Sequence, residues 1–334
     1  MPKLGWTIAI VNFNTSVYIK WVLKTLYEFN NPNSFKIVLI DNTIPTEKNI
    51  LEEIIASYNK KYNNIELIVN KPNTDKYKKL YGRRYPSGEH GEALSIAFER
   101  CDTPYFLAVD PDFFWTKRNI LKFFEKLIQK GYIAIGAPYF SPIGFGDPNF
   151  PGAFGCAYVS KYLQSNDFMP GEYTEEEYIE FEDKYNNEKF VWPFDVGWKI
   201  RKRLSDLKQH ISFEQVNDTS LLRKLGNYGV TAPRQYSLNN EVIGYHLIGG
   251  ARKPSQVFGF MDKPEAEQDI IYENWKKIRN IYGEYFYNIL YTNKNLTVHE
   301  EKYLEYTKNL LLNFIRHPRK NIKKIVNSIF NFTT

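Results

Sequence analysis

The chain has 334 residues, 43% of them apolar and 25% charged, so it can bury the core of one large α/β domain or of a domain with an appended piece. Its two cysteines, Cys101 and Cys156, exclude a disulfide framework, and their spacing does not suit a metal site. We expect each to be a small core residue rather than a nucleophile. The formal net charge of +6 is compatible with an anionic substrate or surface, but it is too small to indicate nucleic-acid binding by itself.

No apolar run approaches the roughly 20 residues that a membrane-spanning helix needs. Met1 leads directly into the strand-like run "WTIAIVNFN", without the basic segment or cleavage site of a signal peptide. We therefore expect a cytoplasmic protein. Near the other end, segment 319–332 is basic and carries an apolar stripe at helical spacing. This segment either makes a peripheral contact with an anionic membrane or packs against the rest of the chain.

Short apolar runs alternate with amphipathic segments from the start of the chain to about Pro264. The spacing predicts strands at 7–11, 35–43, 64–70, 105–109, 132–139 and around His246. It predicts helices at 18–29, 47–62, 87–101 and 119–130, and a further helix that begins after Asp195. The Gly/Pro/Phe-rich stretch 141–155 reads as a loop that shapes a binding surface, and the residues after Pro264 read as helical.

Nearly all of these strands are apolar throughout, which predicts a mostly parallel sheet covered by helices on both faces. In such sheets, ligands bind at the carboxyl ends of the strands. Three polar tips follow predicted strands, namely Asn12–Asn14, Asp41–Asn42 and Asp110–Asp112. We therefore expect these tips to lie on one edge of the sheet and to form the functional site.

The sequence Asp110-Pro111-Asp112 places two carboxylates one residue apart at the end of the apolar strand 105–109. Hard oxygen ligands in this arrangement suit Mg²⁺ or Mn²⁺, which can neutralise the charge on a departing nucleotide diphosphate. The alternative is a surface turn, because Asp and Pro are both common in turns.

From Trp6 to about Ile120 the chain resembles the family 2 glycosyltransferases of the GT-A fold. The resemblance is carried, in order, by "IAIVNFNTSVYIKWVLKTL", "FKIVLIDNT" and "GEHGEALSIAFERCDTPYFLAVDPD". It implies an α/β, GT-A-type, Rossmann-like domain over 1–263, with a nucleotide-sugar-binding half (1–120) and an acceptor half (121–263). Residues 264–334 would then form a helical C-terminal extension.

The resemblance also implies roles for individual residues. The first strand-end loop and the acid of the second strand hold the nucleotide in that family, and the helix before the Asp-x-Asp motif approaches it. The nucleotide-sugar-binding positions expected here are Val11, Asn12, Asn14, Asp41, Arg84, His90, Gly91 and Asp110. The metal ligands expected are Asp112 and His246. The chain departs from the family pattern at Ser95 and Phe98, where many members carry an Asn, and at Glu89-His90.

A catalytic base is also expected from the resemblance, because inverting members use a carboxylate to deprotonate the acceptor hydroxyl. Asp195 in "WPFDVGWKI" matches that position, although Phe194-Asp195 stands where the family has Glu-Asp. Its aromatic neighbours would desolvate the carboxylate and raise its pKa. The alternatives are a helix N-cap role for Asp195, an ordinary hydrogen-bonded role for His246 and a solvent-facing basic loop around Arg84.

The expected activity is transfer of a sugar, with Mn²⁺ or Mg²⁺, from a UDP- or GDP-sugar to a hydroxyl of a glycan or lipid-linked saccharide. One alternative is the same chemistry on a modified DNA base, which would make DNA binding steeply salt-dependent. Another is a non-catalytic binding module on a GT-A scaffold. A nucleotidyltransferase is disfavoured, because the loop "NFNTS" after the first strand has neither Gly nor Lys.

Overall fold

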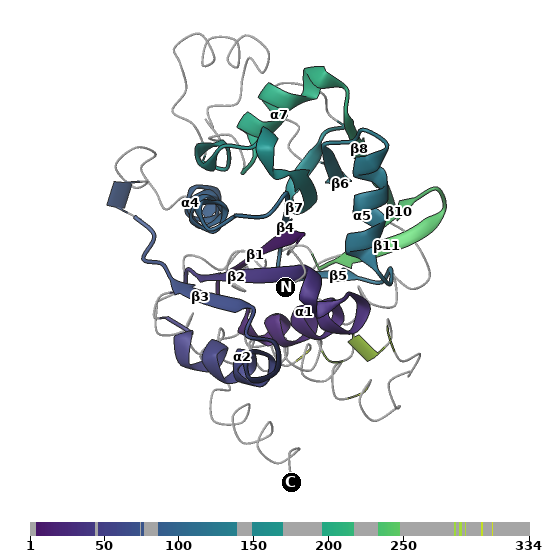
Figure 1. Ribbon diagram of the computed structural model, residues 1–334. Helices are drawn as coiled ribbons and strands as arrows, with labels where there is room; N and C mark the ends of the chain where they lie inside the picture. Colours follow the sequence, from purple (N-terminus) through teal and green to yellow (C-terminus); the bar gives the residue numbers. More distant parts are fainter. Residues whose placement is uncertain are drawn as a thin grey trace. The chain divides into compact units, whose positions relative to one another are not determined.

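In the computed structural model, the described residues are 5–43, 46–73, 75–76, 86–138, 149–169, 196–216 and 233–247, together with 284, 287, 288, 291, 302 and 309 (Figure 1). The chain divides into two compact units. The first contains residues 1–13, 27–111 and 118–215, and the second contains residues 14–26, 112–117 and 216–334.

The larger sheet has seven strands in the order β3-β2-β1-β4-β7-β6-β8. Its strands are β1 (Trp6–Asn12), β2 (Phe35–Asp41), β3 (Ile65–Val69), β4 (Tyr105–Val109), β6 (Ala134–Pro138), β7 (Pro151–Val159) and β8 (His210–Ser212). Strands β3, β2, β1 and β4 pair in parallel, and so do β6 and β8. Strand β7 is antiparallel to both β4 and β6. The prediction of a mostly parallel α/β sheet is therefore confirmed.

Strand β7 corrects one prediction, because residues 151–155 belong to a nine-residue strand and not to the loop expected over 141–155. Strands β6 and β7 approach each other closely here. A Cβ added to Gly136 on β6 would lie 2.3 Å from the Gly155 carbonyl oxygen on β7, so β6 needs a glycine at this point. Burial of the strand, including Cys156, needs small side chains on both faces.

Helices of the first unit, α2 and α4 among them, cover both faces of this sheet. The described helices are α1 (Ser16–Phe29), α2 (Lys48–Tyr62), α4 (Pro86–Glu99), α5 (Ile120–Gln129) and α7 (Trp198–Leu204), with short 3₁₀ turns at 32–34, 160–162, 165–167 and 205–207. Ala93 and Ala97 of α4 pack on Ala9 and Val38 of the sheet, and small side chains there let the helix approach closely. Helix α2 lies on the opposite side of the sheet from α4 (Figure 1).

Local signals explain where several helices begin and end. Helix α2 stops at Asn63, which adopts the left-handed conformation (φ 49°) and donates its N–H to the Asn59 carbonyl. In α5, Ile120, Phe124 and Leu127 are buried at helical spacing, as an amphipathic helix requires. These boundaries agree with the predicted helices 47–62 and 119–130.

A second, four-stranded sheet has the order β5-β11-β10-β9 and was not predicted as a sheet. Its strands are β5 (Phe113–Trp115), β9 (Glu214–Val216), β10 (Arg234–Leu238) and β11 (Glu241–His246). Strands β10 and β11 form a hairpin through Asn239 and Asn240, which both have positive φ (52° and 64°), as a tight two-residue turn requires. The ring of Tyr18 on α1 packs edge-on against that of Phe114 on β5, with centroids 6.3 Å apart.

Among the residues that the structure describes, no helix is long and apolar enough to cross a membrane.

Candidate metal and nucleotide site

The Asp110-Pro111-Asp112 segment follows β4 at the carboxyl end of the strand, where the sequence predicted it. The Asp110 N–H donates to the Phe154 carbonyl of β7 over 2.9 Å. The Asp112 carbonyl accepts from the Leu247 N–H, also over 2.9 Å. Backbone hydrogen bonds therefore hold both aspartates in place, and a free surface turn does not describe them.

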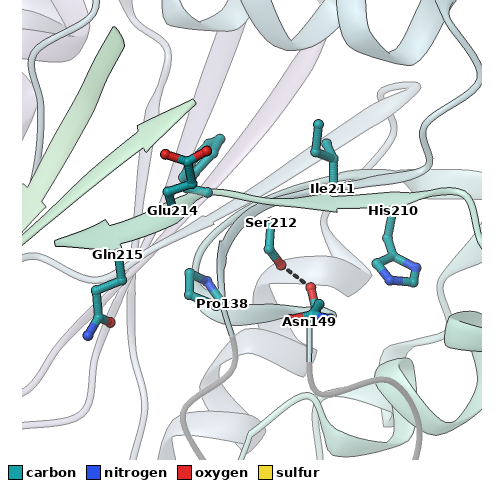
Figure 2. A pocket seen from close by; sticks show the side chains of 8 residues that line it. Pro138, Asn149, His210, Ile211, Ser212, Glu214 and Gln215 are labelled. Atoms are coloured by element: carbon teal, nitrogen blue, oxygen red, sulfur yellow. Dashed lines mark hydrogen bonds between the residues drawn. The ribbon is translucent and has the colours of Figure 1, made fainter. Parts of the chain in front are cut away.

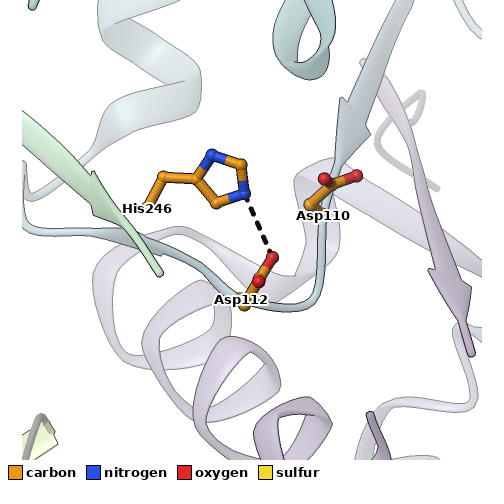
Figure 3. A group of neighbouring side chains, drawn as sticks. All are labelled: Asp110, Asp112 and His246. Carbon is orange, nitrogen blue, oxygen red and sulfur yellow. Dashed lines mark hydrogen bonds and ion pairs between the residues drawn. The ribbon is translucent and has the colours of Figure 1, made fainter. Parts of the chain in front are cut away.

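His246, at the end of β11, lies beside Asp112. Antiparallel pairing of β11 with β5 places His246 opposite Phe113, so the imidazole is next to the carboxylate (Figure 3). His246 Nε2 is 3.2 Å from Asp112 Oδ1, and the two residues are 7% and 5% exposed. Gly244 makes this pairing possible, because a Cβ there would lie 2.7 Å from the Phe114 carbonyl oxygen.

Asp110, Asp112 and His246 together fit a divalent cation. One ligand atom of each residue lies within 4.8 Å of the other two. Pro111 alone separates the two aspartates, so the chain itself keeps their carboxylates close. Two carboxylate oxygens and one imidazole nitrogen suit Mn²⁺, and burial of Asp112 beside a histidine distinguishes this group from an ordinary exposed acidic turn.

His90 and Gly91 lie on α4, close to the first aspartate. His90 Nε2 is 3.6 Å from Asp110 Oδ1, and both side chains are partly exposed. Helix α4 begins at Pro86, so Gly91 is inside the helix and does not form its open N-terminal turn. The structure therefore brings the imidazole of His90 to the carboxylate of Asp110, whereas Gly91 supplies no free terminal N–H.

Asp41, at the end of β2, is surrounded by donors from the protein itself. Its Oδ1 accepts from the side-chain amide of Asn12 (2.9 Å) and from the Thr43 N–H (3.1 Å). Its Oδ2 accepts from the Thr46 hydroxyl (2.5 Å) and from the Glu47 N–H (2.8 Å). Both carboxylate oxygens are thus engaged in holding the segment that leads into α2, and the residue is fully buried.

The remaining predicted nucleotide positions have different surroundings. The amide of Asn12 also donates to Thr43 (3.1 Å) and Glu47 (2.9 Å), so it belongs to the same network as Asp41. Val11 is 6% exposed and packs in the core cluster beneath α4. Asn14 adopts the left-handed conformation (φ 57°) just before α1.

Two predicted site residues, Asp195 and Arg84, lie outside the described residues, as does segment 319–332. The described N-cap of α7 is Gly197, with φ 81°.

A second network at the sheet edge was missed from the sequence. Asn42 donates to the Glu89 carbonyl of α4 over 2.8 Å and accepts from the Asn70 amide over 2.8 Å. Asn42 thereby joins the ends of β2 and β3 to α4. The only sequence signal was the position of Asn42 and Asn70 at the polar ends of the predicted strands 35–43 and 64–70.

No family model matches this sequence, and no curated protein matches it significantly. The solved structures that it resembles include Staphylococcus aureus TarS 1–349, at 13% identity over 92% of this chain and 79% of that chain, with a TM-score of 0.42. Against a longer TarS structure, the match covers 50% of this chain and only 30% of that chain, with a TM-score of 0.36.

A mannosyltransferase from Pyrobaculum calidifontis, solved with GDP-Man and Mn²⁺, is 10% identical over 92% of this chain and 70% of that chain, with a TM-score of 0.39. The galactosyltransferase LgtC, solved with donor and acceptor sugar analogs, is 10% identical over 62% of this chain and 72% of that chain, with a TM-score of 0.40. The P. calidifontis protein and LgtC are both sugar transferases.

Proposed function

We propose that the chain is a GT-A-type glycosyltransferase that uses Mn²⁺ or Mg²⁺ to transfer a sugar from a nucleotide-diphosphate sugar to a hydroxyl group, with inversion. The observation that carries the proposal is the buried pair of Asp112 and His246, with Asp110 two residues away, at the end of a strand. A buried carboxylate is costly unless it is paired or binds a cation. A strand-end group of hard ligands is therefore best explained by a metal that holds a diphosphate.

In this proposal Asp112 and His246 would hold the cation, with Asp110 beside them. The cation would supply charge neutralisation for the departing nucleotide diphosphate. Backbone hydrogen bonds keep both aspartates in position before substrate arrives, which lowers the cost of ordering the site.

The residues of the chain itself have three further tasks in this proposal. The networks of Asp41 and Asn42 hold the ends of β1, β2 and β3, so that the surface facing the nucleotide is formed in advance. His90 is placed to donate a hydrogen bond toward a ligand at the carboxylate pair. Asp195 accepts the proton of the acceptor hydroxyl as general base.

The test is thermal unfolding with UDP, GDP, CMP and dTDP, each with and without Mn²⁺. A ligand that binds only the folded protein raises the midpoint by mass action. We expect a rise for one nucleoside diphosphate that requires the metal and is absent in Asp112→Asn. The matched control is Asp206→Asn, which changes an exposed aspartate of the 3₁₀ turn 205–207. No rise with any nucleotide would refute the proposal.

A further inference from the structure

An open cavity of about 590 Å³ lies beside β8, in the first unit, and the function proposed above does not yet use it (Figure 2). It is within the size range of small-molecule pockets. Its lining includes Pro138, Asn149, His210, Ser212, Glu214 and Gln215. The Ser212 hydroxyl donates to the Asn149 carbonyl, which joins the end of β8 to the residues that lead into β7.

The cavity is on the same edge of the large sheet as Asp110. Strands β6 and β8 run parallel to each other, and β6 and β4 are both antiparallel to β7. The carboxyl ends of β4, β6 and β8 therefore lie on one edge, which carries Asp110, Pro138 and Ser212, respectively. Three strand spacings separate β4 from β8 in the order β4-β7-β6-β8, which amounts to about 14 Å.

The chemistry of the lining favours a neutral, hydroxyl-rich ligand. Glu214 supplies a carboxylate, Gln215 an amide and His210 an imidazole, and each can bond to a hydroxyl group. Among the lining residues that the structure describes, none is a lysine or an arginine, so a phosphate or nucleotide bound there would meet the Glu214 carboxylate without a compensating cation from them. Apolar surface from Pro138 and Ile211 completes the lining and suits the C–H faces of a sugar ring.

We propose that this cavity binds a neutral saccharide unit of the acceptor, at a distance from the hydroxyl that is glycosylated. This inference rests on the proposed function, because it takes Asp110 as the position of the donor. A gap of about 14 Å is longer than one sugar ring, so the acceptor must be an oligosaccharide or polymer that spans it. The acceptor is thus recognised through its sugar chain and not through a phosphate.

The experiment screens the full chain against an array of neutral and acidic oligosaccharides of one to six units, and then measures the best ligand by calorimetry. Glu214→Gln removes the carboxylate, and Gln215→Trp fills the cavity. The matched control is Glu53→Gln on α2, an exposed glutamate that does not line the cavity. We expect the unchanged protein to bind neutral glycans of three or more units. The affinity should be about tenfold weaker in Glu214→Gln, be lost in Gln215→Trp and be the same as that of the unchanged protein in Glu53→Gln.

Hydrolysis of nucleotide-sugars by the unchanged protein is measured in parallel, so that the two proposals can fail separately. If the donor is hydrolysed but no glycan binds, or the cavity variants bind as the control does, the saccharide cavity is refuted and the glycosyltransferase proposal stands. If glycans bind through the cavity but no nucleotide-sugar is ever bound or hydrolysed, the cavity is supported and the chain is a glycan-binding module.

Discussion

The hydroxyl of Tyr291 donates a hydrogen bond to the backbone carbonyl of Trp115 over 2.6 Å. Trp115 is the last residue of β5, and Asp112 lies three residues before it. Tyr291 also contacts the ring of Tyr287, which stacks on Trp21 of α1 at 4.6 Å. Tyr287 and Tyr291 therefore support the short strand that follows Asp112, within the second unit.

Replacing Tyr291 with phenylalanine should weaken both the fold and the metal site. The lost hydrogen bond is worth about 1 kcal/mol, and the freed Trp115 carbonyl would let β5 shift. We expect a lower unfolding midpoint and a several-fold weaker affinity for Mn²⁺, measured by calorimetry. Tyr132→Phe, in the turn before β6, is the control. A drop in stability with unchanged Mn²⁺ affinity would limit Tyr291 to a purely structural role.

Asp112→Asn and His246→Gln should each weaken Mn²⁺ binding at least about tenfold, because each removes a good ligand while the backbone bonds of the segment remain. Paramagnetic resonance of free Mn²⁺ during titration measures the affinity directly. His210→Gln changes a histidine outside the group and should leave it unaltered. Wild-type affinity in both site variants would show that Asp112 and His246 are a structural pair.

Asp41→Asn should act mainly on stability. The new amide would present its N–H₂ to groups that are themselves donors, the Thr46 hydroxyl and the Glu47 N–H. We expect a loss of about 1–3 kcal/mol in the free energy of unfolding, measured with denaturant. The opposite result, unchanged stability with a large loss of nucleotide affinity, would mean that Asp41 binds the nucleotide directly.

Cys156 should be unreactive in the folded protein. Burial raises the pKa of its thiol to about 12, so at pH 8 almost no thiolate is present, and the side chain is inaccessible. A maleimide reagent should label at most Cys101, which is partly exposed, until the protein unfolds. Mass spectrometry of the native and the unfolded protein after treatment with maleimide counts the labelled cysteines. The control is Cys101→Ser, which should take up no label until it unfolds.

The same pKa shift predicts a pH dependence. Because the pKa is higher in the folded than in the unfolded protein, the contribution of Cys156 to stability is complete below about pH 9 and falls as the pH rises toward 12. Cys156→Ala should flatten the decline in that range, and denaturant unfolding at pH 8, 9 and 10 would measure it. An unchanged slope would contradict the shift.

Local sequence patterns determined most elements and the position of the aspartates. The run "TIAIV" lies in β1 and the run "YFLAV" is β4, because a buried parallel strand needs consecutive apolar residues. Asp110 and Asp112 follow β4, because such a strand ends where polar residues begin. The helix predicted at 87–101 is α4, whose alanines fit a helix that packs tightly on a sheet.

Only the tertiary structure decided the rest. Strand β7 could not be predicted, because its glycines and Pro151 signal a loop locally, whereas the strand is formed by pairing with β4 and β6. His246 is 134 residues from Asp112, and no local pattern encodes a 3.2 Å contact that depends on the pairing of β11 with β5. Likewise, the identity of Asp41 was readable from the sequence, but the four donors that engage it come from the way in which the chain folds around it. Burial and hydrogen-bond saturation depend on distant neighbours in the chain, and those neighbours exist only once the strands have paired.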